Sequence, residues 1–258
     1  MRLKVLACET LFREVYLAAA MSPHICDVKL LSRECHDDLQ HMHRVLQEEI
    51  DLTNASEREH LEPVVRCPVC SDAQYDAVVL AMGLCGNTVN GLKAVGAPLV
   101  LSRVHDCSGS LLGGNERYLN EEKRSVFYHQ GAVERLGVER VDAVPRRLGL
   151  GRTLGEYIQD YGEDNGRYIY EMERNFATYN DRALVLTQPT TPEIAQRCEA
   201  DVQQYASQFG WKTVTVPVRS NMITGLLSGA WDDDEFVVVP QGRTLELSVS
   251  TTGDIESS

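Results

Sequence analysis

The 258-residue chain is short of basic residues. It has 25 Lys and Arg against 38 Asp and Glu, for a formal net charge of −13, and no cluster of Lys or Arg stands out. Because nucleic-acid phosphates require a basic surface, we exclude nucleic acid as a partner class. No apolar stretch approaches the roughly 18 to 20 residues that a bilayer-spanning helix needs, so we expect no membrane partner.

The beginning of the chain lacks the features of a secretory leader. The segment MRLKVLACETLF has a short apolar run but no small-residue cleavage signal behind it, so we expect a strand there and a cytoplasmic protein. In that compartment the eight cysteines should be reduced or bind metal more often than they form disulfides. They occupy positions 8, 26, 35, 67, 70, 85, 107 and 198.

Two common motifs are present only in part. Gly83-Leu84-Cys85-Gly86-Asn87 lacks the spacing of a dinucleotide-binding or Walker loop, so its glycines are more simply explained by a close approach of the backbone. Cys67 and Cys70 have zinc-ribbon spacing, but the sequence contains no second such pair. These two cysteines could pair with each other, bind a separate metal or be inert.

The first half of the chain alternates apolar runs with segments of helical periodicity. This alternation predicts a parallel sheet covered by helices. The expected strands are Arg2–Ala7, Asp27–Ser32, Ala77–Met82 and Pro98–Val104, and the expected helices are 10–20, 37–50 and Thr88–Val95.

The last third repeats the pattern of strand, helix, strand, helix and strand. Its expected strands are Ala183–Thr187, Thr213–Val218 and Phe236–Pro240, with helices Pro192–Gly210 and Asn221–Leu227. We therefore predict an α/β protein with two similar Rossmann-like lobes, mainly parallel sheets and helices on both faces. The expected parts are an N-terminal lobe (2–115), a helical connecting segment (116–180), a C-terminal lobe (181–242) and a flexible polar tail (243–258).

Sulfur-bearing and imidazole side chains follow three of the predicted strands. If these strands are parallel, the side chains lie at one edge of the sheet, where α/β proteins place their chemistry. Thiolate and imidazole are the ligands that zinc prefers. We predict a zinc site formed by Cys8, Cys85, His105 and Cys107. The alternative is that the cysteines pack as small apolar residues or that one is a lone reactive thiol.

Two further residues are candidates for proton transfer at this edge. His36 lies just beyond the second strand and could act as an acid or base, although a lone histidine is more often structural or exposed. Asp106 lies between two proposed ligands, where it could be a metal-supporting residue or a base. A turn residue is the more common role for an aspartate in this position.

Several stretches resemble the uncharacterised family catalogued as domain of unknown function 1638. They include LACETLFRE, YDAVVLAMGLCGNTVNGLKA and APLVLSRVHDCSGSLLGGNERYL, and the resemblance extends over about residues 2–242. It marks the proposed ligands and also implies substrate-binding roles for Gly86, Asn87, Arg117 and Tyr118. Relatives tend to be encoded near corrinoid-dependent methyl-transfer systems, which implies a corrinoid as a partner cofactor.

Together these patterns predict a zinc-dependent enzyme that transfers a methyl or alkyl group to a thiol. Zinc bound by sulfur ligands can stabilise a substrate thiolate, and the resemblance adds a connection with corrinoid metabolism. The expected partners are a small thiol or methyl donor and a corrinoid protein. The alternative is a metal or corrinoid carrier or chaperone without turnover.

Overall fold

The computed structural model describes all residues except 55–73, 139–152, 189, 251–252 and 258. Cys67 and Cys70 therefore lie outside the described residues. The chain divides into two compact units, residues 1–119 with 218–258 and residues 120–217. Both contain parallel strands with helices, which confirms the predicted α/β class with mainly parallel sheets.

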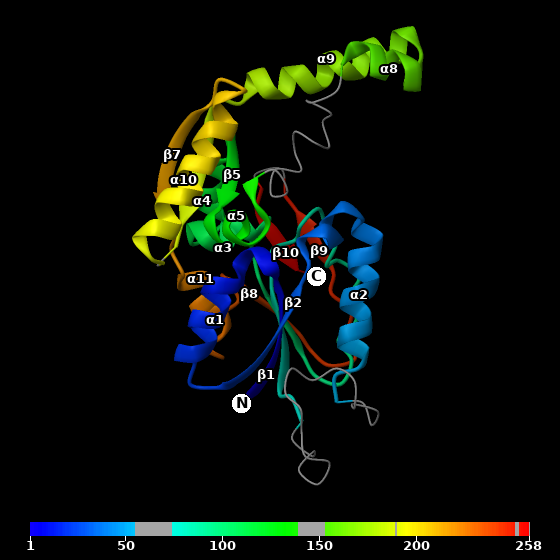
Figure 1. Cartoon of the computed structure of the whole chain (residues 1–258). Helices are drawn as coiled ribbons and strands as arrows, with labels where there is room; N and C mark the ends of the chain where they lie inside the picture. Colours follow the sequence, from blue (N-terminus) through cyan, green and yellow to red (C-terminus); the bar gives the residue numbers. More distant parts are fainter. Residues whose placement is uncertain (55–73, 139–152, 189, 251–252, 258) are drawn as a thin grey trace. The chain divides into compact units, whose positions relative to one another are not determined.

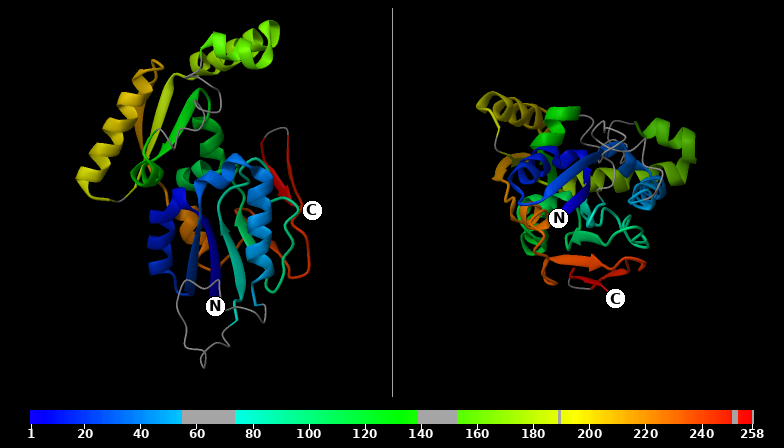
Figure 2. Two further views of the ribbon diagram at one scale, coloured as in Figure 1. Left: turned by 45° about the vertical axis from the view of Figure 1, so that its right-hand side comes forward. Right: turned by 90° about the horizontal axis from the view of Figure 1, so that it is seen from below.

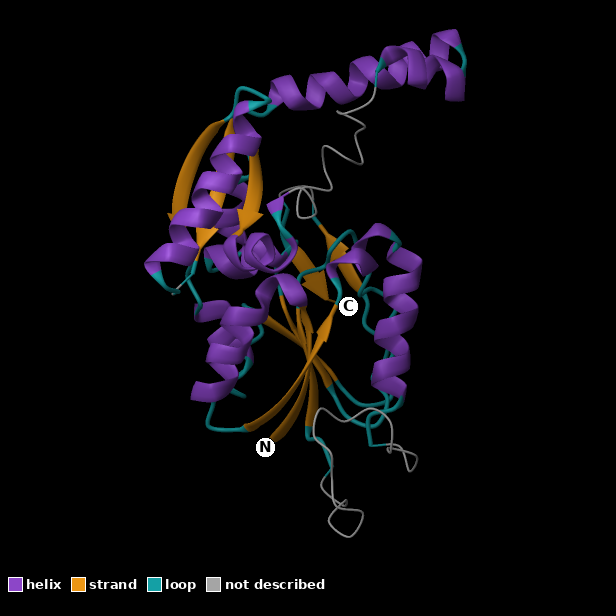
Figure 3. Ribbon diagram, viewed as in Figure 1, coloured by secondary structure: helices purple, strands orange, loops and turns teal. Residues whose placement is uncertain are grey.

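A five-stranded sheet forms the centre of the first unit (Figure 3). Its first four strands are parallel to their neighbours and almost completely buried at the centre, as expected for apolar runs covered on both faces. In spatial order the sheet consists of β2 (Ile25–Leu31), β1 (Arg2–Cys8), β3 (Ala77–Ala81), β4 (Leu99–Ser102) and β8 (Phe236–Val239).

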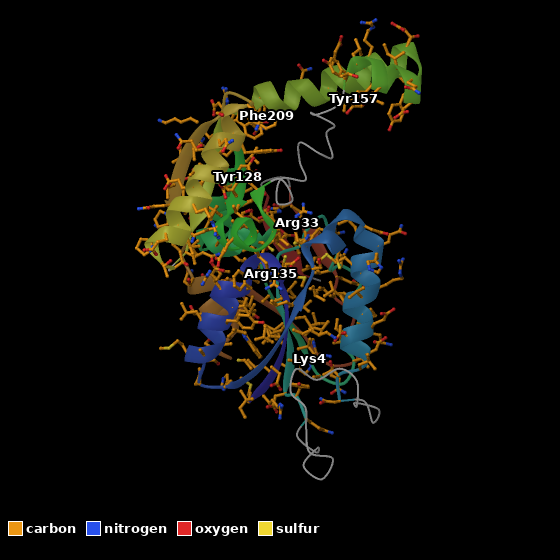
Figure 4. The ribbon with its side chains drawn as sticks, viewed as in Figure 1. Lys4, Arg33, Tyr128, Arg135, Tyr157 and Phe209 are labelled. Carbon is orange, nitrogen blue, oxygen red and sulfur yellow. The ribbon has the colours of Figure 1, made fainter. Side chains whose placement is uncertain are left out.

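Helices α1 (Phe12–Met21) and α2 (Leu39–Asp51) lie on opposite sides of this sheet (Figure 1). The α2 helix buries Met42, Leu46 and Ile50, and Asp38 caps its N-terminus by accepting a hydrogen bond from the main-chain N–H of His41. Lys4 of β1, labelled in Figure 4, pairs with Glu49 of α2 at 3.5 Å. The short elements of this unit are η1 (Glu9–Leu11), η2 (Arg33–Asp37), α3 (Cys107–Leu112), α4 (Asn115–Glu121) and α11 (Asn221–Leu226).

The helix predicted over Thr88–Val95 is wrong. The segment begins with turns and continues into an isolated bridge between Lys93 and Thr244, so several of its main-chain groups bond to a distant part of the chain. Gly91 N–H donates to the carbonyl of Leu245 at 2.8 Å, and Leu245 N–H donates to the carbonyl of Leu92 at 2.7 Å. Gly91 also has a φ of 86°, which a right-handed helix cannot accommodate.

The segment Phe236–Pro240, which we expected in the second lobe, pairs with the first sheet instead. As β8 it runs antiparallel to β4 and extends the sheet at its edge, with Val238 facing Val100. An antiparallel strand can join either end of a parallel sheet, so its apolar sequence alone does not determine which sheet it enters.

The polar segment after Arg243, which we expected to be a flexible tail, contains two antiparallel strands. These are β9 (Leu247–Val249) and β10 (Ile255–Ser257), red in Figure 2. Leu245, Leu247 and Ile255 are buried and fix the segment to the first unit. Three apolar side chains at separated positions were too weak a signal to predict this pairing.

The second unit contains three parallel strands, β5 (Ser125–His129), β6 (Arg182–Thr187) and β7 (Lys212–Pro217). The first of these interrupts the connecting segment that we expected to be helical. Helices α5 (Gln130–Leu136) and α10 (Pro192–Ser207) pack on this sheet, with Tyr128 fully buried among them (Figure 4). Helices α8 (Leu154–Tyr161) and α9 (Glu163–Tyr179) pack against each other, and the ring of Tyr157 contacts those of Tyr161 and Tyr170.

Candidate functional site

Three neighbouring strands of the first sheet end in cysteine-bearing segments at the same edge. The β1 strand ends at Cys8, β3 leads into the loop containing Cys85, and β4 leads into the turn before Cys107. Because β1 pairs with β3 and β3 with β4, all in parallel, their carboxyl ends lie side by side. Cys8 is 1% exposed and Cys107 5% exposed, whereas Cys85 is intermediate.

The loops after β3 and β4 pack directly against each other. The main-chain N–H of Cys85 donates to the carbonyl of His105 at 2.9 Å. A Cβ atom on Gly83 would lie 2.4 Å from the Cα of Asp106, so only glycine permits this approach. Close packing of the two loops is what brings Cys85 and Cys107 together.

The backbone around Cys85 is held in an unusual conformation. Cys85, Gly86 and Asn87 have φ values of 46°, 72° and 70°, so three successive residues are left-handed. This conformation costs a residue with a Cβ about 1 to 2 kcal/mol. The hydroxyl of Thr88 stabilises the turn by donating to the carbonyl of Cys85 at 2.8 Å. Backbone strain at a thiol-bearing residue is typical of functional sites.

The three cysteines and His36 form a connected group, which we call the thiol cluster. Sγ of Cys8 lies 3.3 Å from Nε2 of His36 and 3.0 Å from the hydroxyl of Thr10. The thiol of Cys107 interacts with those of both Cys8 and Cys85, and these interactions shift its pKa. The cluster therefore extends from Cys85, at the more exposed end, through Cys107 and Cys8 to His36.

Contacts between thiols and burial disfavour the thiolate form within this cluster. The hydrogen bond to Cys107, followed by burial, raises the pKa of Cys8 well above its ordinary value. At Cys107 the hydrogen bond from Cys8 lowers the pKa, but the contact with Cys85 and burial outweigh it, so the pKa is again raised. Without a bound cation, both buried residues remain neutral thiols at pH 7.

The donor types of the thiol cluster fit zinc, although its buried thiols are protonated here. Three sulfurs and one imidazole form a common zinc-ligand set. Among the described residues, no group of three or more His, Cys, Asp or Glu side chains is arranged to hold a metal ion. Metal binding would replace the thiol contacts and release their protons.

Comparison with known proteins assigns the chain to a family. Residues 30–227 match the family described as "Protein of unknown function (DUF1638)". The chain belongs to this family. No curated protein and no solved structure matches it. Within this DUF1638 chain, His36, Cys85 and Cys107 lie inside the matched range, whereas Cys8 lies before it.

In the part of this DUF1638 protein that the structure describes, no helix combines the length and apolar character needed to cross a membrane.

His105 of the DUF1638 protein makes a different contact from the one we predicted. Its Nε2 lies 2.8 Å from the carbonyl of Gly253, and its ring lies 5.7 Å from that of Tyr118. Asn115 donates to the same carbonyl at 2.8 Å. His105 thus connects the turn after β4 to the C-terminal strands, while His36 makes the contact with Cys8.

Asp106 has the role of a helix cap. Its carboxylate accepts hydrogen bonds from the main-chain N–H groups of Ser108 and Gly109 at 2.7 and 3.1 Å, at the start of α3. The hydroxyl of Tyr118 donates to its other oxygen at 3.2 Å. These three bonds hold the segment that carries Cys107, and they favour the turn role over that of a base.

The predicted substrate-binding residues have different environments. Gly86 and Asn87 are exposed on the loop beside Cys85. Arg117 of α4 has a buried Nη1 atom with no hydrogen-bond partner among the described residues. A buried guanidinium nitrogen favours a hydrogen-bond acceptor as its partner.

Glu9 is a site-supporting residue that the sequence did not reveal. Its carboxylate accepts hydrogen bonds from the main-chain N–H of Arg33 at 2.6 Å and from the hydroxyl of Ser32 at 3.1 Å. These bonds connect the end of β1 to the start of η2, which carries His36. Glu9 is buried, and its position directly after Cys8 was the only available signal in the sequence.

Proposed function

We propose that this protein is a zinc-dependent enzyme that transfers a methyl or alkyl group to a thiol. The observation that supports the proposal most directly is the convergence of Cys8, Cys85, Cys107 and His36 at one edge of a parallel sheet. Four donors from separate segments of the chain, in contact one after another, are more than apolar packing of cysteines requires.

The ligands that we assign are the four members of the thiol cluster. His36 replaces His105 in the predicted set because Nε2 of His36 already contacts Sγ of Cys8, whereas Nε2 of His105 contacts a carbonyl. Glu9 supports the His36 segment and Asp106 supports the Cys107 segment. Ligands fixed by such hydrogen bonds bind metal more tightly than mobile ones.

Bound zinc would lower the pKa of a substrate thiol and keep it as the nucleophilic thiolate. Of the three cysteines, Cys85 is the most exposed, so we place substrate entry on its side of the cluster. Arg117 would bind an acidic group of the thiol substrate through its unpartnered Nη1. Asn87 and Gly86, exposed in the neighbouring loop, would contact the remainder.

Metal content tests the binding part of this proposal. Protein purified without chelators should contain close to one zinc per chain, and Cys85→Ser should contain much less. Cys26→Ser is the matched control, since Cys26 lies on β2 and its thiol donates to the carbonyl of His24. A content below about 0.2 metal per chain, or full retention by Cys85→Ser, would contradict the proposal because intact ligation is near stoichiometric.

Turnover separates an enzyme from a carrier. We would incubate the zinc-loaded protein with methylcobalamin and 2-mercaptoethanol and measure the methyl thioether by mass spectrometry. In this transfer the cobalt–carbon bond breaks, a carbon–sulfur bond forms, the thiol loses its proton and the cobalt keeps the electron pair. Stoichiometric binding of methylcobalamin without thioether would instead indicate the metal or corrinoid carrier.

A further inference from the structure

One helix of the first unit has an outer face without a charged side chain. The exposed residues of α1 are Tyr16, Leu17, Ala20 and Met21, and Met21 is 77% exposed. A surface helix normally carries charged and polar residues on the face opposite the core. The outer face of α1, defined by these four residues, therefore has the composition of a contact surface.

The neighbouring strand β2 has an unpaired edge. It lies at the end of the five-stranded sheet, and among the described residues it pairs with β1 alone. The N–H of Ile25 donates to the carbonyl of Met1, on the β1 side, at 3.1 Å. Because main-chain groups alternate in direction along a strand, those of Cys26, Val28 and Leu30 point to the free edge. A mostly apolar edge of seven residues is a template for pairing with another strand.

We infer that the outer face of α1 and the free edge of β2 form an interface between two copies of this chain. Two edge strands related by a two-fold axis pair antiparallel, and full overlap of the seven residues places the axis at Val28. In that register Cys26 lies opposite Leu30 of the second copy, and the two Val28 residues lie opposite each other. The outward-pointing N–H and C=O groups of all three residues then have hydrogen-bond partners.

The same register pairs the charges of β2. A lysine in an edge strand commonly opposes pairing with another chain. Here antiparallel pairing around Val28 places Lys29 opposite Asp27 of the second copy, and opposite charges in this position stabilise a sheet. Within its own chain Asp27 already pairs with Arg2 at 2.6 Å. Lys29 likewise pairs with Glu49 at 2.5 Å, so charges of alternating sign would follow one another across the interface.

The exposed apolar area is of the size that a dimer requires. Tyr16, Leu17, Met21 and Ile25 are each about half exposed or more. At about 200 Å² for a large side chain, these four expose roughly 500 Å². Helix α1 packs on β2, so the edge of that strand adds to this area, and each partner of a stable dimer contributes about 800 Å². The interface does not depend on the proposed zinc chemistry.

Size-exclusion chromatography with light scattering tests the inference on the full chain. The unaltered protein should have twice the 28.8 kDa mass of one chain. Leu17→Lys with Met21→Lys should have the mass of one chain, because association would bury charges without partners. The control is Tyr168→Lys with Met172→Lys, which places the same charges at the same spacing on the exposed side of α9 and should remain a dimer. Unchanged circular dichroism would show that the variants are folded.

Hydrogen exchange in the unaltered protein tests the strand pairing without any variant. In the dimer the N–H of Val28 should exchange as slowly as amides in a central strand, whereas an unpaired edge leaves it open to water. Fast exchange at Val28 would overturn the proposed pairing. The mass of a single chain at about 100 μM would overturn the inference, because stable interfaces of this size bind more tightly. Dissociation by the α9 variant alone would overturn it too and would assign association to α9.

Discussion

Nε2 of His36 lies 3.3 Å from Sγ of Cys8, although 28 positions separate the two residues in the chain. The contact exists because β1 and β2 are parallel neighbours with Cys8 opposite Leu31, so their carboxyl ends emerge together. A histidine that follows β2 is therefore directed to the thiol that ends β1. His105, only two residues from Cys107 in sequence, bonds to the C-terminal segment instead.

Substitution of the two histidines should separate their roles. His36→Ala should reduce zinc affinity by about 100-fold or more, because it removes a proposed ligand. His105→Ala should retain zinc but increase hydrogen exchange in residues 253–257, since it removes a bond to Gly253. Inductively coupled plasma mass spectrometry and hydrogen-exchange mass spectrometry measure the two effects. Zinc loss in His105→Ala with normal content in His36→Ala would restore His105 as the ligand.

Continuous apolar runs made the central strands predictable. Arg2–Cys8, Ala77–Ala81 and Leu99–Ser102 agree with the expected boundaries to within a few residues. Apolar side chains on both faces of a strand are a local signal, and they also imply parallel pairing. The same argument predicts that Cys8, Cys85 and Cys107 lie at one edge of the sheet.

Interactions between distant segments account for the errors. The turns over 88–95 form because Leu245 supplies both an acceptor and a donor to them, and no pattern within 88–95 contains that information. The spacing of His105 and Cys107 predicts a shared metal, and this stays a prediction, but spacing does not determine where an imidazole points. The carbonyl of Gly253, 148 residues away, is its partner.

The contact between the two loops predicts a strong effect of one methyl group. Gly83→Ala would place a Cβ 2.4 Å from the backbone of Asp106, so the loops must separate. We expect a loss of about 1 to 3 kcal/mol in the free energy of unfolding, together with lower zinc content. Gly155→Ala in α8 is the control, since its nearest atom would be 3.9 Å away, and it should be neutral or stabilising. Urea denaturation with equal losses in both variants would contradict the close packing.

The raised pKa of Cys8 predicts how the stability of the metal-free protein depends on pH. Burial and the contact with Cys107 keep this thiol protonated when folded, whereas the unfolded chain loses the proton near the ordinary value of 9.0. Above that pH the folded state binds more protons, so stability should fall as pH rises, with a slope of up to about 1.4 kcal/mol per pH unit per thiol. Chelator-treated protein would be unfolded in urea between pH 7.5 and 10. Cys8→Ala should have a shallower slope, and identical slopes would contradict the assignment.

Asp106 should stabilise the protein mainly by capping the N-terminus of α3. Asp106→Ala leaves two main-chain N–H groups of α3 without their acceptor and should cost about 0.5 to 2 kcal/mol. Tyr118→Phe removes only the hydroxyl bond to the same carboxylate and should cost about 0.5 to 1.5 kcal/mol. Because the two residues share that carboxylate, the double variant Asp106→Ala with Tyr118→Phe should cost less than the sum of the single variants. Additive losses in urea denaturation would show that the Tyr118 hydroxyl stabilises the protein independently of Asp106.

Asp106→Asn keeps an acceptor oxygen for the cap but cannot act as a base, so normal thioether formation by this variant would assign Asp106 to the structure of the site alone.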